Sequence, residues 1–164
     1  MLFRALCVIL SVFTMLISGI LANTATASAA PTGNYCTGFA EPVAPGSRDL
    51  VITDVTCSDT LTQVAVPAVK IAEFYEHGGF GGRRFDLLVS VACDGAGYSV
   101  NNMDGVNAQI GGMSSYRLMG QCSRSTIYTG LSKTGSSSGT LYGDQSQVSG
   151  TFNDRTRSFR AWRG

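Results

Sequence analysis

The sequence has few of the side chains that most enzymes use for catalysis. Among 164 residues, His77 is the single histidine, and it lies in a glycine-rich stretch where we expect a turn residue rather than a general base. The sequence patterns of serine hydrolases, zinc proteases and phosphate-binding loops are missing. Glu73 and Glu76, the closest glutamates, are an odd number of positions apart on one expected strand, so they would point to opposite faces. We therefore predict that the protein is not an enzyme.

The chain also lacks an excess of charge of either sign. The chain has twelve Lys and Arg residues and eleven Asp and Glu residues, so its net charge gives no global attraction to nucleic acid or to an anionic membrane. Basic and aromatic residues do alternate near the end of the sequence, a pattern that can bind phosphate or single-stranded nucleic acid. The simpler interpretation is a terminal strand with a buried aromatic face and a solvated arginine face. We predict a monomer without a nucleic-acid partner. The alternating residues are Arg155, Arg157, Phe159, Arg160, Trp162 and Arg163.

Residues 1–29 have the pattern of an export signal. Arg4 precedes a nearly unbroken apolar run, Ala5–Leu21, and Ala27-Ser28-Ala29 forms a small-residue cleavage site. The apolar run is shorter than the roughly 20 residues that a membrane-spanning helix needs, so a retained anchor is the less favoured alternative. We predict cleavage after Ala29 and a secreted, extracellular protein with no membrane contact thereafter.

No pair of cysteines has the C-x-x-C spacing of zinc or redox sites. Cys36, Cys57, Cys93 and Cys122 lie beyond the signal, and an even number of cysteines in a small exported chain indicates two disulfides. The sequence permits three connectivities. Pairing between sequence neighbours, Cys36–Cys57 and Cys93–Cys122, is our expectation.

Short runs of β-branched and aromatic residues recur between turn signals, and no long segment has a helical period. This pattern predicts an all-β sandwich. Residues 30–68 are less patterned, and we treat them as an N-terminal extension. The expected strands are Asp49–Thr56, Val69–Tyr75, Arg84–Ser90, Ser115–Met119, Ser125–Tyr128, Gly139–Tyr142 and Thr156–Trp162.

Two weakly similar halves follow residue 69. Tyr75, Phe80 and Gly82 define the first pattern, and the same spacing recurs at Tyr128, Lys133 and Gly135, where lysine replaces the middle aromatic residue. Each glycine can adopt a positive φ that lets a hairpin fold over. Later in each half a serine can hydrogen-bond the folded turn. The residues expected to define the fold are Tyr75, Phe80, Gly82, Ser115, Tyr128, Gly135 and Ser158.

Together with Asn153–Ser158, these patterns resemble the βγ-crystallin superfamily, particularly its small secreted bacterial members, over roughly Val69 to Trp162. The resemblance implies two Greek-key motifs packed as a sandwich. We expect the domain at residues 69–164, with the first Greek key at about 69–120 and the second at about 121–164.

Many members of that family bind calcium through a loop of the form N/D-N/D-x-x-S/T-S, whose oxygen atoms suit a hard cation. Asn153 and Asp154 match the first two positions, but Arg157 stands where a hydroxyl would bind the ion. In the first half, Ile110 and Gly111 occupy the acidic or amide positions. The sequence therefore indicates no certain cofactor. Weak calcium binding at Asn153 and Asp154 is the alternative to a purely structural turn.

The resemblance implies binding rather than catalysis. Inhibition of extracellular proteases, notably metalloproteases, is the leading expectation, with an extracellular protease as the partner. The alternatives are a calcium-binding or structural extracellular protein and a small secreted antimicrobial toxin. The exposed candidates for a reactive loop are Gly130–Gly139 and Cys93–Gly112.

Overall fold

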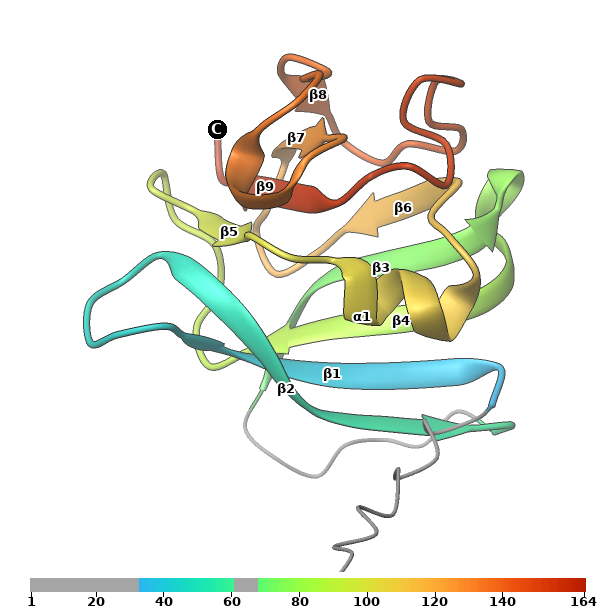
Figure 1. Ribbon diagram of the computed structural model, residues 1–164. Helices are drawn as coiled ribbons and strands as arrows, with labels where there is room; N and C mark the ends of the chain where they lie inside the picture. Colours follow the sequence, from blue (N-terminus) through green and yellow to red (C-terminus); the bar gives the residue numbers. More distant parts are fainter. Residues whose placement is uncertain (1–32, 61–67) are drawn as a thin grey trace, which may run out of the picture.

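The computed structural model describes residues 33–60 and 68–164. The expected signal peptide, residues 1–29, and its cleavage site lie outside these ranges. Within them the chain is mostly β-structure with one α-helix, so the all-β fold class is confirmed (Figure 1). The strands are β1 (Tyr35–Pro42), β2 (Asp49–Ser58), β3 (Val69–His77), β4 (Gly81–Val89), β5 (Tyr98–Val100), β6 (Ser115–Leu118), β7 (Arg124–Tyr128), β8 (Leu141–Tyr142) and β9 (Ser158–Trp162); α1 spans Asp104–Ile110, and the 3₁₀ turns η1 and η2 span Gly78–Phe80 and Leu131–Lys133.

The strands follow the order β6-β3-β4-β1-β2-β5-β9-β7-β8 in one curled sheet. The two halves of the sequence exchange pairing partners within it. β5 from the first half pairs with β9 of the second, and Gln145 from the second half bridges Tyr116 on β6. This exchange joins the halves through backbone hydrogen bonds as well as through the core.

The core lies where the sheet curls over on itself. Phe74 on β3 and Phe159 on β9 meet edge to face with ring centroids 5.1 Å apart, and Tyr116 on β6 lies 5.6 Å from Phe159 in the same manner. Edge-to-face pairs of this kind add to the free energy gained from burying the rings. Aromatic residues from both halves therefore fill one shared core.

β1 and β2 form a hairpin that is hydrogen-bonded into the sheet on both sides. β1 runs parallel to β4, and β2 runs parallel to β5. Gly38 of β1 leaves no room for a side chain. A Cβ there would collide with the Phe85 ring and would lie only 2.8 Å from Ile52 Cγ2. The described part of the expected extension is thus a structural bridge between the two halves.

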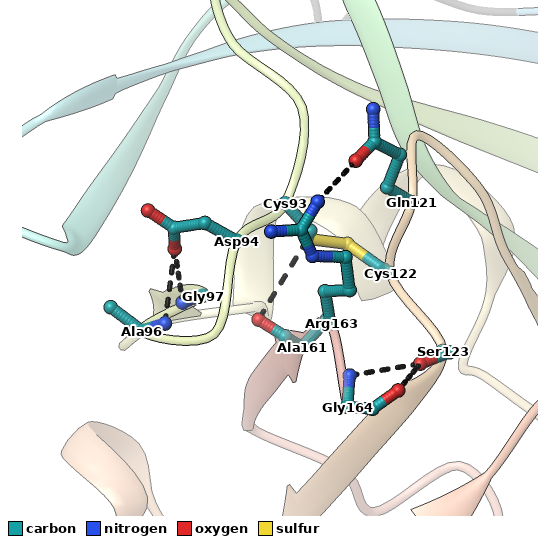
Figure 2. Close-up of a disulfide and its surroundings, with 10 residues drawn as sticks. All are labelled: Cys93, Asp94, Ala96, Gly97, Gln121, Cys122, Ser123, Ala161, Arg163 and Gly164. Atoms are coloured by element: carbon teal, nitrogen blue, oxygen red, sulfur yellow. Dashed lines mark hydrogen bonds between the residues drawn. A yellow bond between two sulfur atoms is a disulfide. The ribbon is translucent and has the colours of Figure 1, made fainter.

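Both disulfides join sequence neighbours, as expected. Cys36–Cys57 crosses the β1–β2 hairpin, and Cys93–Cys122 ties the segment after β4 to the connection between β6 and β7 (Figure 2). The second bond lies beside Ala161 of β9, whose carbonyl oxygen is 3.9 Å from the Cys93 sulfur. Each bond therefore links segments that approach one another only in the folded chain.

All seven expected strands overlap an observed one, but β1, β5 and α1 were not foreseen. β5 and α1 lie within Cys93–Gly112, where the sequence predicts an exposed loop. That expectation is wrong, because Cys93, Val100, Met103 and Ile110 are all buried. Of the helices that the structure describes, none is long and apolar enough to cross a membrane.

Candidate functional site

The first hairpin folds over its own sheet at η1. Gly79, Phe80 and Gly82 all have positive φ, at 69°, 63° and 76°. A Cβ at Gly82 would lie 2.9 Å from the Cβ of Glu76, so both conformation and space require glycine. The fold brings the Phe80 ring against Tyr75, with centroids 5.6 Å apart and planes at 64°. We call this arrangement the first clasp.

Ser115 fastens the first clasp from the neighbouring strand. Its hydroxyl donates to the carbonyl of His77 at 2.6 Å and accepts from the backbone N–H of Phe80 at 3.1 Å. Ser115 is buried, so these bonds satisfy two backbone groups of a turn that lacks ladder bonds. His77 itself is exposed and contributes its backbone to the clasp.

The second hairpin repeats this geometry around η2. Ser132, Lys133 and Gly135 have φ of 50°, 64° and 74°, close to the values in the first clasp. Ser158 donates to the carbonyl of Gly130 at 2.7 Å and accepts from the N–H of Lys133 at 2.9 Å. The two halves are therefore copies of one supersecondary unit at the level of individual hydrogen bonds.

Lys133 gives the second clasp a contact that the first clasp does not have. Instead of a ring packed on Tyr128, it sends an ammonium group to Asp49 on β2, at 2.9 Å. The hydrogen bond from Lys133 holds the pKa of Asp49 below its usual range. The second clasp is thus tied to the β1–β2 hairpin through Lys133, while residues 131–137 of the expected exposed stretch Gly130–Gly139 are exposed.

Asn153 and Asp154, the candidate calcium ligands, lie in the turn before β9. Ser114 donates to Asp154 Oδ1 at 3.2 Å, and Asn153 Nδ2 donates to Asp154 Oδ2 at 2.8 Å. Both carboxylate oxygens therefore already accept hydrogen bonds. In the described ranges no three His, Cys, Asp or Glu side chains gather as a metal-binding group.

An arginine side chain lies near the loop positions expected for calcium in each half. In the second half, Arg157 makes two hydrogen bonds to Asp104 of α1, and this contact holds the pKa of the Asp104 carboxyl below its usual range. In the first half, Arg83 Nη1 donates to the carbonyl of Gln109 at 3.0 Å, beside the Gly111 position. A guanidinium at each place supplies positive charge and donors where a cation would need oxygen acceptors.

Glu73 and Glu76 are held by different cations. Burial opposes ionisation of Glu73, but hydrogen bonds from Lys70 at 2.8 Å and Tyr75 at 2.6 Å hold its pKa below the usual range. Glu76 is paired with Arg83, whose hydrogen bonds lower the pKa of Glu76 to about 2. The two glutamates therefore form separate ion pairs rather than one acid–base couple.

The end of β1 and its connection to β2 form another exposed segment. Six consecutive residues, Glu41–Gly46, are exposed, and Val43 keeps 58% of its surface accessible. This segment, the β1–β2 loop, extends beyond the other strands (Figure 1). This loop was not among the expected exposed segments, although Pro45-Gly46 is a signal for a type II turn.

Hydrogen bonds fix the shape of the β1–β2 loop. The N–H of Ser47 donates to the carbonyl of Ala44 at 2.9 Å, and Gly46 has φ of 78°, as a type II turn requires. The N–H of Val43 donates to the carbonyl of Asp49 at 2.9 Å. The loop is therefore a preformed turn at the end of a ladder.

Comparisons with known proteins give structural likeness only. No protein-family model and no curated protein matches the sequence. Among solved structures, a βγ-crystallin domain from Flavobacterium johnsoniae is 18% identical, with a TM-score of 0.43 over 57% of this chain and 96% of that domain. A βγ-crystallin domain from Clostridium beijerinckii is 21% identical, with a TM-score of 0.42 over 57% and 98%. A clostrillin double mutant, with two serines replaced by histidine and bound to nickel, is 22% identical with a TM-score of 0.43.

Because the identities and TM-scores are low, nothing about the ligands or partners of this chain is concluded from these similarities. The fold is visible in the chain's own geometry: two serine-fastened clasps, one in each half, and an exchange of strand pairing around a shared aromatic core. The described residues therefore have a βγ-crystallin-like fold.

Proposed function

We propose that this protein is a secreted, non-enzymatic binding protein that inhibits an extracellular protease through the β1–β2 loop. The observation that carries this proposal is the combination of exposure and rigidity in that loop. Val43, an exposed apolar side chain, stands on a turn whose backbone is fixed by hydrogen bonds. A preformed loop loses little conformational entropy on binding, which favours affinity.

The base of the loop is held by contacts to both halves of the fold. Arg48 pairs with Asp94 at 2.6 Å and lies over the ring of Tyr98, with its guanidinium carbon 5.4 Å from the centroid. Next to it, Asp49 receives the ammonium of Lys133. These contacts come from the connection before β5 and from the second clasp, so the loop cannot swing independently of the body.

The side-chain pockets of a protease cleft suit the exposed apolar side chain of this loop. Proteases bind their substrates as extended segments through backbone hydrogen bonds, while side-chain pockets select the residues next to the cleaved bond. Val43 offers an apolar side chain for such a pocket. If a bond in the loop were cut, the β1–β2 ladder and Cys36–Cys57 would keep the two new ends in place. Rebinding of the cut form would then compete with release.

Two disulfides support an extracellular site of action, because oxidising compartments preserve such bonds. The export signal expected in residues 1–29 points the same way. We favour inhibition over the calcium-binding alternative, since Arg157 is engaged with Asp104 where a liganding hydroxyl would be needed.

The experiment is a titration of purified protein, residues 30–164, against a panel of metalloproteases and serine proteases, with calcium and with chelator added to the inhibitor before dilution. Inhibition predicts a loss of activity that ends at one equivalent of protein for at least one protease. Full protease activity across the panel at tenfold excess would reject the proposal.

A further inference from the structure

The outer face of the second half carries a row of alternating rings and guanidinium groups. Tyr142 on β8, Arg124 on β7 and Trp162 on β9 occupy one register, because Arg124 is the backbone partner of both rings. Arg160 follows on the same face of β9, two residues before Trp162. We call these four residues the outer row.

Stacking orders the outer row. The guanidinium carbon of Arg124 lies 5.5 Å from the centroid of Tyr142, and that of Arg160 lies 4.9 Å from the centroid of Trp162. Such cation–π contacts hold the side chains. Arg160 Nη2 also donates to the carbonyl of Ala96 at 3.4 Å. Tyr142 keeps 69% of its surface exposed, the largest value among the exposed hydrophobic side chains of the described residues.

The arginines of the outer row lack carboxylate partners. None of the ion pairs among the described residues includes Arg124 or Arg160, and Arg163 beside them donates to the amide oxygen of Gln121 at 2.8 Å (Figure 2). The nearby carboxylate of Asp94 is taken by Arg48 and by the N–H groups of Ala96 and Gly97. By contrast, six described cations are paired: Arg48, Lys70, Arg83, Arg84, Lys133 and Arg157.

We propose that the outer row binds an acidic polysaccharide. Guanidinium groups bind carboxylates with two parallel hydrogen bonds, and among the described residues no carboxylate engages Arg124 or Arg160. The largely exposed ring of Tyr142 beside them offers an apolar surface for a sugar ring. Rings and charges alternate along the row, as rings and carboxylates do in a chain of uronic acids.

The low net charge of the chain favours a sugar polymer over nucleic acid as the ligand of the outer row. The whole chain has a formal net charge of +1, so it lacks the extended positive field with which proteins track a nucleic-acid backbone. Two unpaired arginines can instead bind a few carboxylates on a polymer of lower charge density. This surface lies on β7, β8 and β9, and its use does not depend on protease inhibition through the β1–β2 loop.

Trp162 makes the test direct, because it is the single tryptophan of the sequence and lies in the outer row. Intrinsic fluorescence therefore reports binding at this surface. Oligogalacturonate added at 20 mM NaCl should change the emission in a saturable manner, 0.5 M NaCl should abolish the change, and neutral dextran should cause none.

The decisive variant is Arg124→Gln combined with Arg160→Gln. Because it removes both guanidinium groups, the double variant should bind about tenfold more weakly. Arg155→Gln is the control, because Arg155 is exposed and unpaired but lies before the other end of β9. Circular dichroism and Tm would show that all variants fold.

Two results would overturn the proposal. One is the absence of a saturable change with oligogalacturonate, or equal affinity in the double variant and the wild type. The other is tighter binding of an oligothymidylate than of oligogalacturonate, which would assign the outer row to nucleic acid.

Discussion

Arg157 and Asp104 form a two-bond ion pair that joins the turn before β9 to α1. Nε of Arg157 lies 3.0 Å from Oδ1 of Asp104, and Nη2 lies 2.5 Å from Oδ2. Because both side chains are exposed, the pair contributes little to the free energy of unfolding. Its larger consequence is for cations, since Arg157 occupies the position where the resemblance to βγ-crystallins implies a liganding hydroxyl.

Replacing Arg157 by threonine should therefore create calcium dependence. Arg157→Thr restores a hydroxyl oxygen, removes one positive charge and leaves Asp104 free to attract the ion. With a Kd of about 1 mM, 10 mM calcium would stabilise the variant by ~1.4 kcal/mol, a rise in Tm of roughly 3–6 °C. Differential scanning calorimetry with calcium and with chelator measures the shift. Arg155→Thr is the matched control, and equal shifts in wild type and Arg157→Thr would contradict this account.

The serine hydroxyls of the two clasps should matter for stability in equal measure. Ser115→Ala or Ser158→Ala leaves one carbonyl and one N–H of a partly buried turn without a partner. Each substitution should lower the free energy of unfolding by about 1–3 kcal/mol. Urea denaturation measures this loss, and Ser90→Ala, at an exposed position after β4, serves as the control. A cost at one clasp but not the other would mean that the two copies are not equivalent.

Glu76 should make the fold sensitive to acid. Hydrogen bonds from Arg83 lower the pKa of Glu76 from 4.5 to about 2, so the folded state favours the ionised carboxylate. The resulting stabilisation is present above pH 4.5 and is lost as the pH falls from 4.5 toward 2. Because the pair is solvent-screened, its size is at most about 1 kcal/mol.

Glu76→Gln tests that assignment, since the amide cannot ionise. The dependence of the free energy of unfolding on pH should be flatter in this variant than in the wild type between pH 4.5 and 2, as measured by urea denaturation at several pH values. Glu41→Gln removes a carboxylate from an exposed position as the control. Parallel curves for wild type and Glu76→Gln would show that Glu76 does not contribute.

Local patterns in the sequence predicted much of the fold. β3, β4, β6, β7 and β9 combine β-branched or aromatic residues with nearby turn glycines, so their period and boundaries are visible. β5 is too short to show a period, and the seven residues of α1 make two turns without a side-chain cap. β1 was hidden by Gly38, whose missing side chain makes room for Phe85 from a distant strand. Such features are determined by partners that sequence position does not reveal.

The same distinction applies to the candidate sites. The bonds of Ser115 and Ser158 follow from a local glycine and serine signature, and the structure brings these residues to their turns. The projection of the β1–β2 loop depends instead on parallel pairing with β4 and β5, which lie far along the chain. The outer row likewise needs three strands in register before its rings and arginines meet.

The central claim is that the β1–β2 loop enters a protease cleft, and Val43→Asp tests it most directly. Val43 and Val91 are similarly exposed, at 58% and 61%, so Val91→Asp is a matched control outside the loop. The measurement is the inhibition constant of each variant against a protease that the wild type inhibits. Since a central apolar anchor contributes 2 kcal/mol or more to binding, Val43→Asp should weaken inhibition by about 30-fold or more, and Val91→Asp should leave it unchanged. Equal inhibition by Val43→Asp and the wild type would contradict the account.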